Sequence, residues 1–270
     1  MNTTITEKQN QVEKNINGPA GDIHIMDLGK GGLPVVFIHA FGGSIKQWES
    51  QTEHLKPKRR VIALDIRGHG ASDPSSNNDY GVTSIANDIA AVVDSLNLER
   101  FILVGHSMGG SSAISYASKH PDRVAGLLIT GTPGKTPAEQ SKPIIASLES
   151  DKYDTVMEEY MKKLLLNAKP ETNQLEREGM NKISKQSSLS MIKALFQYDP
   201  LPDLRKYNGP VLIVSRPGDE QPDSLHNAFP SIPYKVVEGT SHWIQLDKPE
   251  EFNRILDEFL NMVDKESNSR

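Results

Sequence analysis

The 270-residue sequence contains no cysteine, which excludes disulfide bonds, thiolate nucleophiles and cysteine-ligated metal sites. It also contains no run of eighteen apolar residues, so we expect no transmembrane helix. The first 20 residues are polar and lack the apolar segment of a secretory signal. By default, these absences favour a cytoplasmic protein.

Basic residues are not in excess either. Lys and Arg number 30 against 35 Asp and Glu, and no dense basic cluster occurs, so nucleic acid is not an expected partner. Neither a His-Glu-x-x-His motif nor an Asp-rich calcium loop is present, and the glycines of residues 105–110 have the wrong spacing for a dinucleotide loop. We therefore expect no metal and no cofactor, and the sequence does not specify an oligomeric state.

Short apolar runs alternate along the chain with helical patterns. Near-continuous apolar strands separated by helices predict a mostly parallel sheet that is covered on both faces, an α/β fold. A more strictly alternating segment, Asp22–Met26, is expected to pair antiparallel at one edge. The apolar runs are Val35–Ile38, Val61–Leu64, Phe101–Val104, Gly126–Ile129, Val211–Val214 and Tyr234–Val237.

The alternation stops between Thr132 and Asn208, where the sequence is rich in helical patterns and shows no strand signal. We interpret this stretch as a helical cap inserted between two strands of the sheet. The predicted organisation is a polar tail over 1–20, a core made of 21–132 and 209–264, a helical cap over 133–208 and a short tail over 265–270.

Residues 101–110 read Phe-Ile-Leu-Val-Gly-His-Ser-Met-Gly-Gly, an apolar run that ends in Gly-x-Ser-x-Gly. This pattern predicts a nucleophile elbow, in which Ser107 occupies a strained turn between a strand and a helix at the end of the sheet. Gly105 and Gly109 would allow the strand and the helix to cross closely. A tight turn with a solvated serine is the alternative.

A serine hydroxyl needs a neighbouring base to take its proton. His242 follows the last predicted strand and therefore lies at the same sheet edge as Ser107, which makes it the preferred base among eight histidines. We expect kcat/KM to rise through one ionisation near 6 to 7. A solvated surface histidine is the alternative interpretation.

The loop after Val211–Val214 contains three carboxylates that could orient the imidazole, Asp219, Glu220 and Asp223. Asp219 is preferred because it directly follows Gly218, which can turn the chain towards the site. Negative charge on a tetrahedral intermediate would need backbone N–H donors, for which Met108 and Phe41 are the candidates.

Together these segments resemble the α/β-hydrolase superfamily, and specifically its small, capped, esterase-like members. The resemblance extends from about Gly21 to Val263 and depends on five segments: His39–Gly43, Asp65–Gly70, Gly105–Gly109, the loop near Asp219, and His242. It implies the nucleophile Ser107, the general base and acid His242 and the orienting acid Asp219. The sequence departs from the usual pattern at Ala40 and, in the acid loop, at Arg216 and Pro217, where the family commonly has glycine.

The resemblance implies hydrolysis of a small or medium carboxylic ester or lactone through an acyl-enzyme. The alternatives are perhydrolysis, carbon–carbon hydrolysis or cyanohydrin lysis by the same triad, or a slow-turnover ligand receptor. Substrate contacts are expected from apolar side chains around the serine and in the cap: Phe41, Trp243, Leu148, Met161, Leu164 and Phe196.

Overall fold

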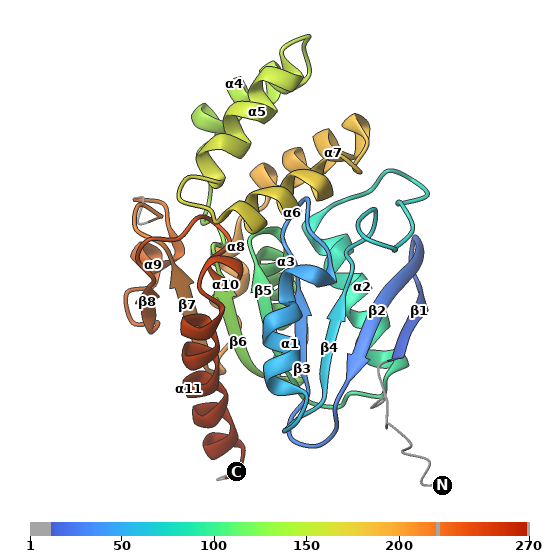
Figure 1. The fold of residues 1–270 in the computed structure, drawn as a ribbon, viewed down its shortest axis with the longest axis vertical. Helices are drawn as coiled ribbons and strands as arrows, with labels where there is room; N and C mark the ends of the chain where they lie inside the picture. Colours follow the sequence, from blue (N-terminus) through green and yellow to red (C-terminus); the bar gives the residue numbers. More distant parts are fainter. Residues whose placement is uncertain (1–11, 220–221, 269–270) are drawn as a thin grey trace, which may run out of the picture.

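An eight-stranded sheet forms the centre of the computed structural model, which describes residues 12–219 and 222–268 (Figure 1). The strand order is β1-β2-β4-β3-β5-β6-β7-β8. β2 pairs antiparallel with both of its neighbours, β1 and β4, and the pairs from β4 to β8 are parallel. The strands are β1 (Val12–Gly18), β2 (Gly21–Leu28), β3 (Val35–Ile38), β4 (Val61–Leu64), β5 (Phe101–His106), β6 (Val124–Thr130), β7 (Val211–Ser215) and β8 (Tyr234–Val236).

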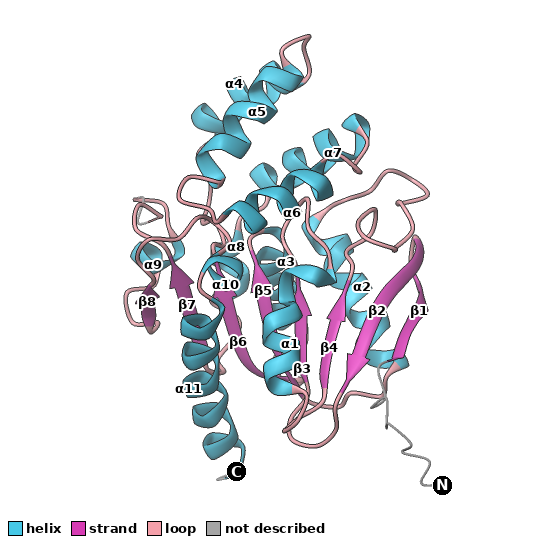
Figure 2. Ribbon diagram, in the orientation of Figure 1, coloured by secondary structure: helices cyan, strands magenta, loops and turns pink. Residues whose placement is uncertain are grey.

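Helices cover both faces of the sheet and its carboxyl edge (Figure 2). Four lie along the faces: α1 (Glu49–Leu55), α2 (Val82–Ser95), α3 (Met108–Lys119) and α11 (Pro249–Asn268). Five form the segment between β6 and β7: α4 (Ala138–Leu148), α5 (Tyr153–Leu164), α6 (Pro170–Met180), α7 (Lys185–Gln197) and α8 (Pro200–Leu204). Three short elements, η1 (Ile45–Trp48), α9 (Leu225–Ala228) and α10 (Ile244–Asp247), lie in loops.

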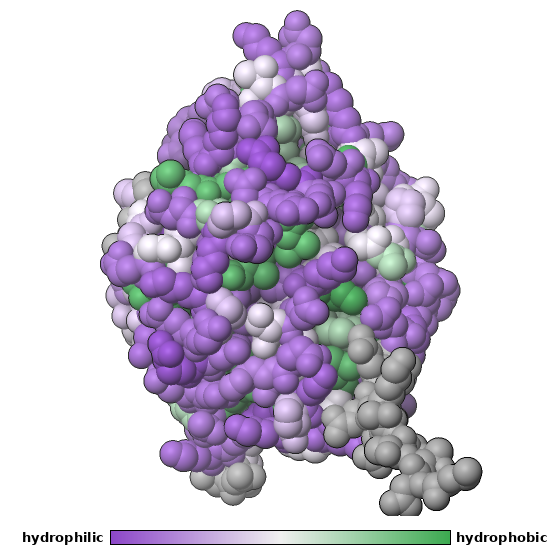
Figure 3. All heavy atoms as spheres, in the orientation of Figure 1, coloured by the Kyte–Doolittle hydropathy of each residue, from purple (hydrophilic) through white to green (hydrophobic). Residues whose placement is uncertain are grey.

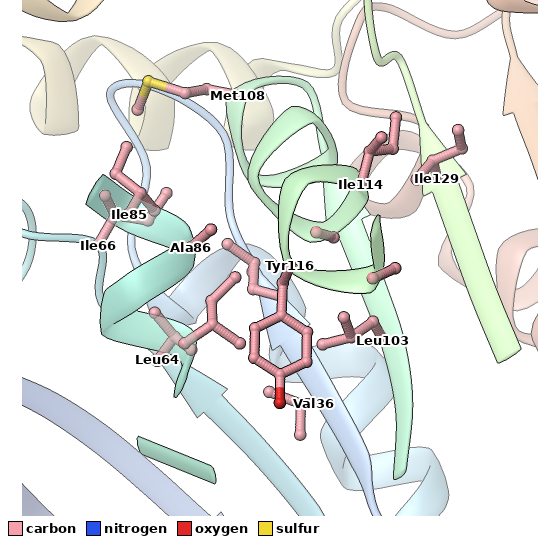
Figure 4. Close-up of a cluster of buried hydrophobic side chains, with 14 of the residues drawn as sticks. Val36, Leu64, Ile66, Ile85, Ala86, Leu103, Met108, Ile114, Tyr116 and Ile129 are labelled. Atoms are coloured by element: carbon pink, nitrogen blue, oxygen red, sulfur yellow. The ribbon is translucent and has the colours of Figure 1, made fainter. Parts of the chain in front are cut away.

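The sheet is buried on both sides, as its continuous apolar strands require. Every residue of β3, β4, β5 and β6 is buried. One apolar cluster joins one face of the sheet to α2 and α3. Figure 4 shows part of it, with Tyr116 of α3 close to Leu103 and Val36 of the sheet and Ile114 of α3 close to Ile129 of β6. A second cluster joins the opposite face to α1 and α11. The sequence-based prediction of a mostly parallel, doubly covered sheet is confirmed.

The two ends of the chain differ from the sequence-based expectation. Residues 1–20 were expected to be a polar tail, but Val12–Gly18 form β1, which pairs along its whole length with β2. β2 is therefore the second strand from the edge and not the edge itself. The strand is hard to recognise because its apolar Ile16 stands among polar residues and packs into the core near Ile23. Residues 1–11 lie outside the described part.

The carboxyl-terminal end is helical where a tail was expected over 265–270, since α11 continues to Asn268. In the described part of the chain, no helix has both the length and the apolar character that crossing a bilayer demands. The face shown in Figure 3 is mostly hydrophilic, with separate hydrophobic patches.

Candidate active site

Ser107 lies between β5 and α3 with φ 53° and ψ −116°, a backbone conformation that non-glycine residues adopt only under strain. Its N–H donates to the Thr130 carbonyl at 2.9 Å, which ties the turn to β6. The flanking glycines are needed for space. A Cβ on Gly105 would stand 2.6 Å from the Gly110 Cα, and one on Gly109 would collide with the carbonyls that end β3. The sequence therefore builds a sharp strand-to-helix turn that carries a 7% exposed serine.

A cavity of about 250 Å³ brings Ser107, His242 and Asp219 together. The three residues come from the ends of β5, β8 and β7, which meet at the carboxyl edge of the sheet below the cap (Figure 1). This edge is where ligands bind in open α/β sheets. The cap closes the cavity with side chains of α5 and α7: Tyr160, Leu164, Leu195 and Phe196.

His242 is 8% exposed, and its backbone N–H donates to the Leu164 carbonyl of α5 at 2.9 Å. Burial and, to a smaller extent, the positive charge of Arg216 together lower the pKa of His242 from its ordinary value to about 3. Both causes favour the neutral imidazole. A neutral imidazole is the form that can accept a proton from a serine hydroxyl.

His106 supports this loop from inside the sheet. Its Nδ1 faces the Gln245 side-chain amide at 3.1 Å, and its Nε2 faces the His242 carbonyl at 3.0 Å. An amide nitrogen can only donate and a carbonyl can only accept, so the proton is assigned to Nε2. The ring lies 4.7 Å from the His242 ring. His106 therefore positions the His242 backbone and is not itself directed at the serine.

Asp219 lines the cavity, but its carboxylate is paired with Arg216, with Oδ1 3.2 Å from Nε. Burial raises the pKa of the Asp219 carboxyl, and the guanidinium of Arg216 opposes that shift. Arg216 also donates to the carbonyls of Lys163 and Leu164 at the end of α5. Arg216 thus holds the acid loop to the cap. Asp223 lines the same cavity, and Glu220 lies outside the described residues.

In the loop after β3, the N–H groups on both sides of Phe41 are held by side chains of the protein. Ala40 donates to the Gln47 side chain at 3.0 Å, and Gly42 donates to His69 Nε2 at 3.0 Å. Between them, the Phe41 N–H donates to no atom in the described parts of the chain, and the same holds for the Met108 N–H at the start of α3. These are the two donors that the sequence singled out for an oxyanion hole.

The residues expected to contact substrate fall into two groups. Leu164 and Phe196 line the cavity that contains Ser107. The other four are placed in packing: Leu148 and Phe41 belong to the large apolar cluster, while Met161 packs with Trp243 behind His242. Among the residues described, no group of three His, Asp or Glu side chains is close enough to hold a metal ion.

Comparison with known proteins identifies the family. Residues 34–173, more than half of the chain, match the model of the alpha/beta hydrolase fold family. The chain belongs to this family. A curated relative, the putative 2-succinyl-6-hydroxy-2,4-cyclohexadiene-1-carboxylate synthase of Bacillus subtilis, is 29% identical over 85% of this chain and 90% of its own length.

Two solved structures show the same fold as this alpha/beta hydrolase. The thermophilic esterase of Thermogutta terrifontis superposes with a TM-score of 0.80 at 23% identity, covering 93% of this chain and 99% of its own. An enzyme described as degrading N-acyl homoserine lactones superposes with a TM-score of 0.79 at 25% identity, covering 91% of this chain and 100% of its own.

Sequence reasoning about this alpha/beta hydrolase missed three residues that shape the site. Arg216 was noted only as a departure from the family pattern, and its pairing with Asp219 was not foreseen. His106 was not singled out in the sequence, although it holds the His242 carbonyl. Gln47 was not singled out either, although its side chain bonds to Ala40 and to Glu176 of the cap. The sequence contains little signal for Gln47, because nothing in it shows that this polar side chain is buried.

Proposed function

We propose that this alpha/beta hydrolase cleaves small or medium carboxylic esters or lactones through an acyl-enzyme on Ser107. One observation carries the proposal: a strained, buried serine at a strand-to-helix turn shares a single cavity with His242 and Asp219. Their chain order, Ser, Asp, His, is the order that the nucleophile-elbow architecture uses.

In the proposed reaction, Ser107 Oγ attacks the carbonyl carbon while His242 takes the serine proton. The negative oxygen of the tetrahedral intermediate accepts from the N–H groups of Phe41 and Met108. The C–O bond to the leaving alcohol then breaks, and His242 returns the proton to that alcohol. Water repeats the sequence on the acyl-enzyme and releases the carboxylic acid. Asp219 stabilises the imidazolium and offsets the charge of Arg216.

The size of the cavity supports a small or medium acyl group. About 250 Å³ lies slightly below the usual range for pockets that hold drug-sized ligands. Its apolar side chains come from the cap and β7, including Leu164, Phe196 and Ile213. Similarity to an esterase and to a lactone-degrading enzyme favours an ester or a lactone.

A second candidate is suggested by the Bacillus subtilis relative, which is named as a synthase and not as a hydrolase. The same Ser, His and Asp could serve that kind of chemistry, or perhydrolysis or carbon–carbon cleavage. A panel of esters, lactones and diketones, assayed with the same preparation, separates these activities from ester hydrolysis.

The nucleophile is tested by Ser107→Ala on an activated ester. We expect kcat to fall by roughly 10³ to 10⁶ with KM little changed. A fluorophosphonate should label the wild-type protein at Ser107, as located by peptide mass spectrometry. Ser111→Ala is the matched control, because Ser111 is buried one turn along α3 and its hydroxyl has no hydrogen-bond partner in the described residues. Activity of Ser107→Ala within tenfold of wild type would show that another residue is the nucleophile.

A further inference from the structure

One face of cap helix α6 lies directly on the loop that follows β3. A Cβ on Gly179 would collide with the Gly42 carbonyl, and a Cβ on Gly42 would collide with the sulfur of Met180. Glu176 is one turn before them and therefore on the same face of the helix. The three α6 positions, 176, 179 and 180, form a contact between the cap and the loop that carries Phe41.

Within this contact, the side chain of Gln47 connects the cap to the backbone of the loop. Its Oε1 accepts from the Ala40 N–H at 3.0 Å, and its Nε2 donates to the two oxygens of Glu176 at 2.9 and 2.8 Å. An amide has an acceptor on one side and a donor on the other. The carboxyl group of Glu176 therefore decides which way the Gln47 amide is turned, and with Nε2 facing the cap, Oε1 faces Ala40.

This link sets the residue beside the proposed oxyanion donor. The Ala40 N–H is held by Gln47, and the Gly42 N–H is held by His69, whose lowered pKa of about 3 keeps Nε2 free to accept. Phe41 lies between these two fixed peptides, so its N–H direction follows from theirs. A shift of the Gln47 side chain would turn the Ala40 peptide and, with it, the Phe41 N–H.

The link is made by groups that are costly to bury. Glu176 is 1% exposed and Gln47 is 1% exposed. Burial raises the pKa of Glu176 to about 8, while the hydrogen bond from Gln47 opposes the shift. In either protonation state, a carboxyl oxygen can accept from Nε2, so the orientation of the amide is maintained. An apolar residue at 176 would fill the space at no desolvation cost but would leave Nε2 without a partner.

We propose that Glu176 and Gln47 are positioning residues through which the cap fixes the oxyanion hole. The inference rests on the proposed function, since it concerns the Phe41 donor of that reaction. Helix α6 does not line the serine cavity, yet through this link it would contribute to the chemistry as well as covering the core.

The test replaces Glu176 by methionine, which removes the acceptor and roughly keeps the volume. Removal of an oxyanion donor costs about 10² to 10³ in kcat, and a misdirected donor should cost less, so we expect kcat on an activated ester to fall by roughly 10- to 100-fold. KM should change less than about threefold because the serine cavity is untouched. Glu178→Met is the matched control, since Glu178 is exposed on the same helix and should retain wild-type kcat.

A double substitution separates positioning from general packing. In Gln47→Glu combined with Glu176→Gln, the carboxylate would accept from the Ala40 N–H and from the new amide at 176, so kcat should recover to within about threefold of wild type. The rate of Ser107 labelling by a fluorophosphonate provides a second readout that does not require the natural substrate. It should fall and recover in parallel with kcat.

The outcomes distinguish the two proposals. If the wild-type protein is neither labelled at Ser107 nor active on esters, the proposed function fails. If the wild type is active and folded Glu176→Met keeps its kcat and labelling rate, the positioning role is overturned. It is equally overturned if the double variant folds but stays as slow as Glu176→Met, because the effect would then reflect packing alone.

Discussion

Asp219 and Arg216 place opposite charges three residues apart in the loop that faces His242. An unpaired Arg216 would lower the pKa of His242 further. By pairing with the guanidinium, the Asp219 carboxylate limits the effect of Arg216 on the imidazole. In the proposed mechanism Asp219 would therefore have two tasks, to orient His242 and to neutralise the charge of Arg216.

Asp219→Asn should lower kcat on an activated ester by roughly 10² to 10⁴, as removal of an orienting carboxylate does elsewhere. Asp223→Asn should lower kcat by less than about tenfold, because the proposed mechanism gives Asp223 no role. Asp223 also lines the cavity, but the N-cap of the following helix is Ser224 and not Asp223. Steady-state kinetics of both variants decide the assignment. A larger loss in Asp223→Asn would transfer the role to that residue.

The acid limb of kcat/KM should lie at least one pH unit below 6.5, because burial and Arg216 both lower the pKa of His242. Above that limb the imidazole is neutral and the profile should be flat. Arg216→Gln removes a positive charge beside the ring, so the limb should move upward towards 6.5. Profiles measured between pH 4 and 8 test this. An ordinary limb near 6.5 that is unchanged in Arg216→Gln would contradict the prediction.

At this scale, the sequence indicated which residues meet but not how they ionise. Ser107 and His242 could be placed at one sheet edge because each follows a recognisable strand. The expected ionisation of His242 near 6 to 7 used the ordinary pKa of histidine. The burial that lowers this pKa depends on long-range packing, including His106 of β5 and Leu164 of the cap, which lie far from His242 in the chain. The Arg216–Asp219 pair was equally out of reach, because three acids competed for it in the sequence.

At the scale of elements, α5 and α7 form the cavity wall while α4 packs on the core without lining the cavity. Helical patterns identify such segments as helices, but not the neighbours that each face will contact. Leu148 and Met161 were as reasonable as Leu164 and Phe196 on sequence grounds. The buried strands were predictable because their apolar runs are continuous, whereas β1 was not, because its outward face is polar.

Phe196→Ala should lengthen the cavity and shift the preferred acyl chain towards longer esters, because the side chain lines the space above Ser107. Leu148→Ala is the control. This fully buried side chain lies outside the cavity, so the change should lower stability by about 2 to 5 kcal/mol and leave the chain-length preference unaltered. Hydrolysis rates across a series of p-nitrophenyl esters measure the preference. An unchanged profile in Phe196→Ala would show that the acyl group lies elsewhere.

At the scale of the whole molecule, buried neutral histidines make stability depend on pH. Burial lowers the pKa of His39 to about 4 and those of His69 and His242 to about 3, while the unfolded chain titrates near 6.5. Between these values the unfolded state binds more protons, so each histidine makes stability fall as pH falls, by about 1.4 kcal/mol per pH unit. The raised pKa of Glu176 has the opposite effect on stability, because this carboxyl binds more protons in the folded state, and it offsets the contribution of one histidine.

The urea midpoint should therefore be clearly lower at pH 5 than at pH 7. His54→Gln should leave this difference intact, because His54 is partly exposed and bonds only at the surface to Asp257. Equilibrium unfolding followed by far-ultraviolet circular dichroism provides the measurement. Equal midpoints at the two pH values would mean that the buried rings do not remain neutral in the folded protein.

The large apolar cluster contains both sheet residues and cap residues, among them Tyr153, Met157 and Met191. A smaller cluster likewise joins Met161 and Leu165 of the cap to Trp243 of the core. Within the described residues, both apolar clusters that contain cap side chains therefore also contain side chains of the framework. A chimaera that exchanged 133–208 for the corresponding helices of a relative would have mismatched surfaces at α3 and at the loop after β3. We therefore expect specificity in this family to change by substitution of single residues that face Ser107, and not by exchange of the whole cap.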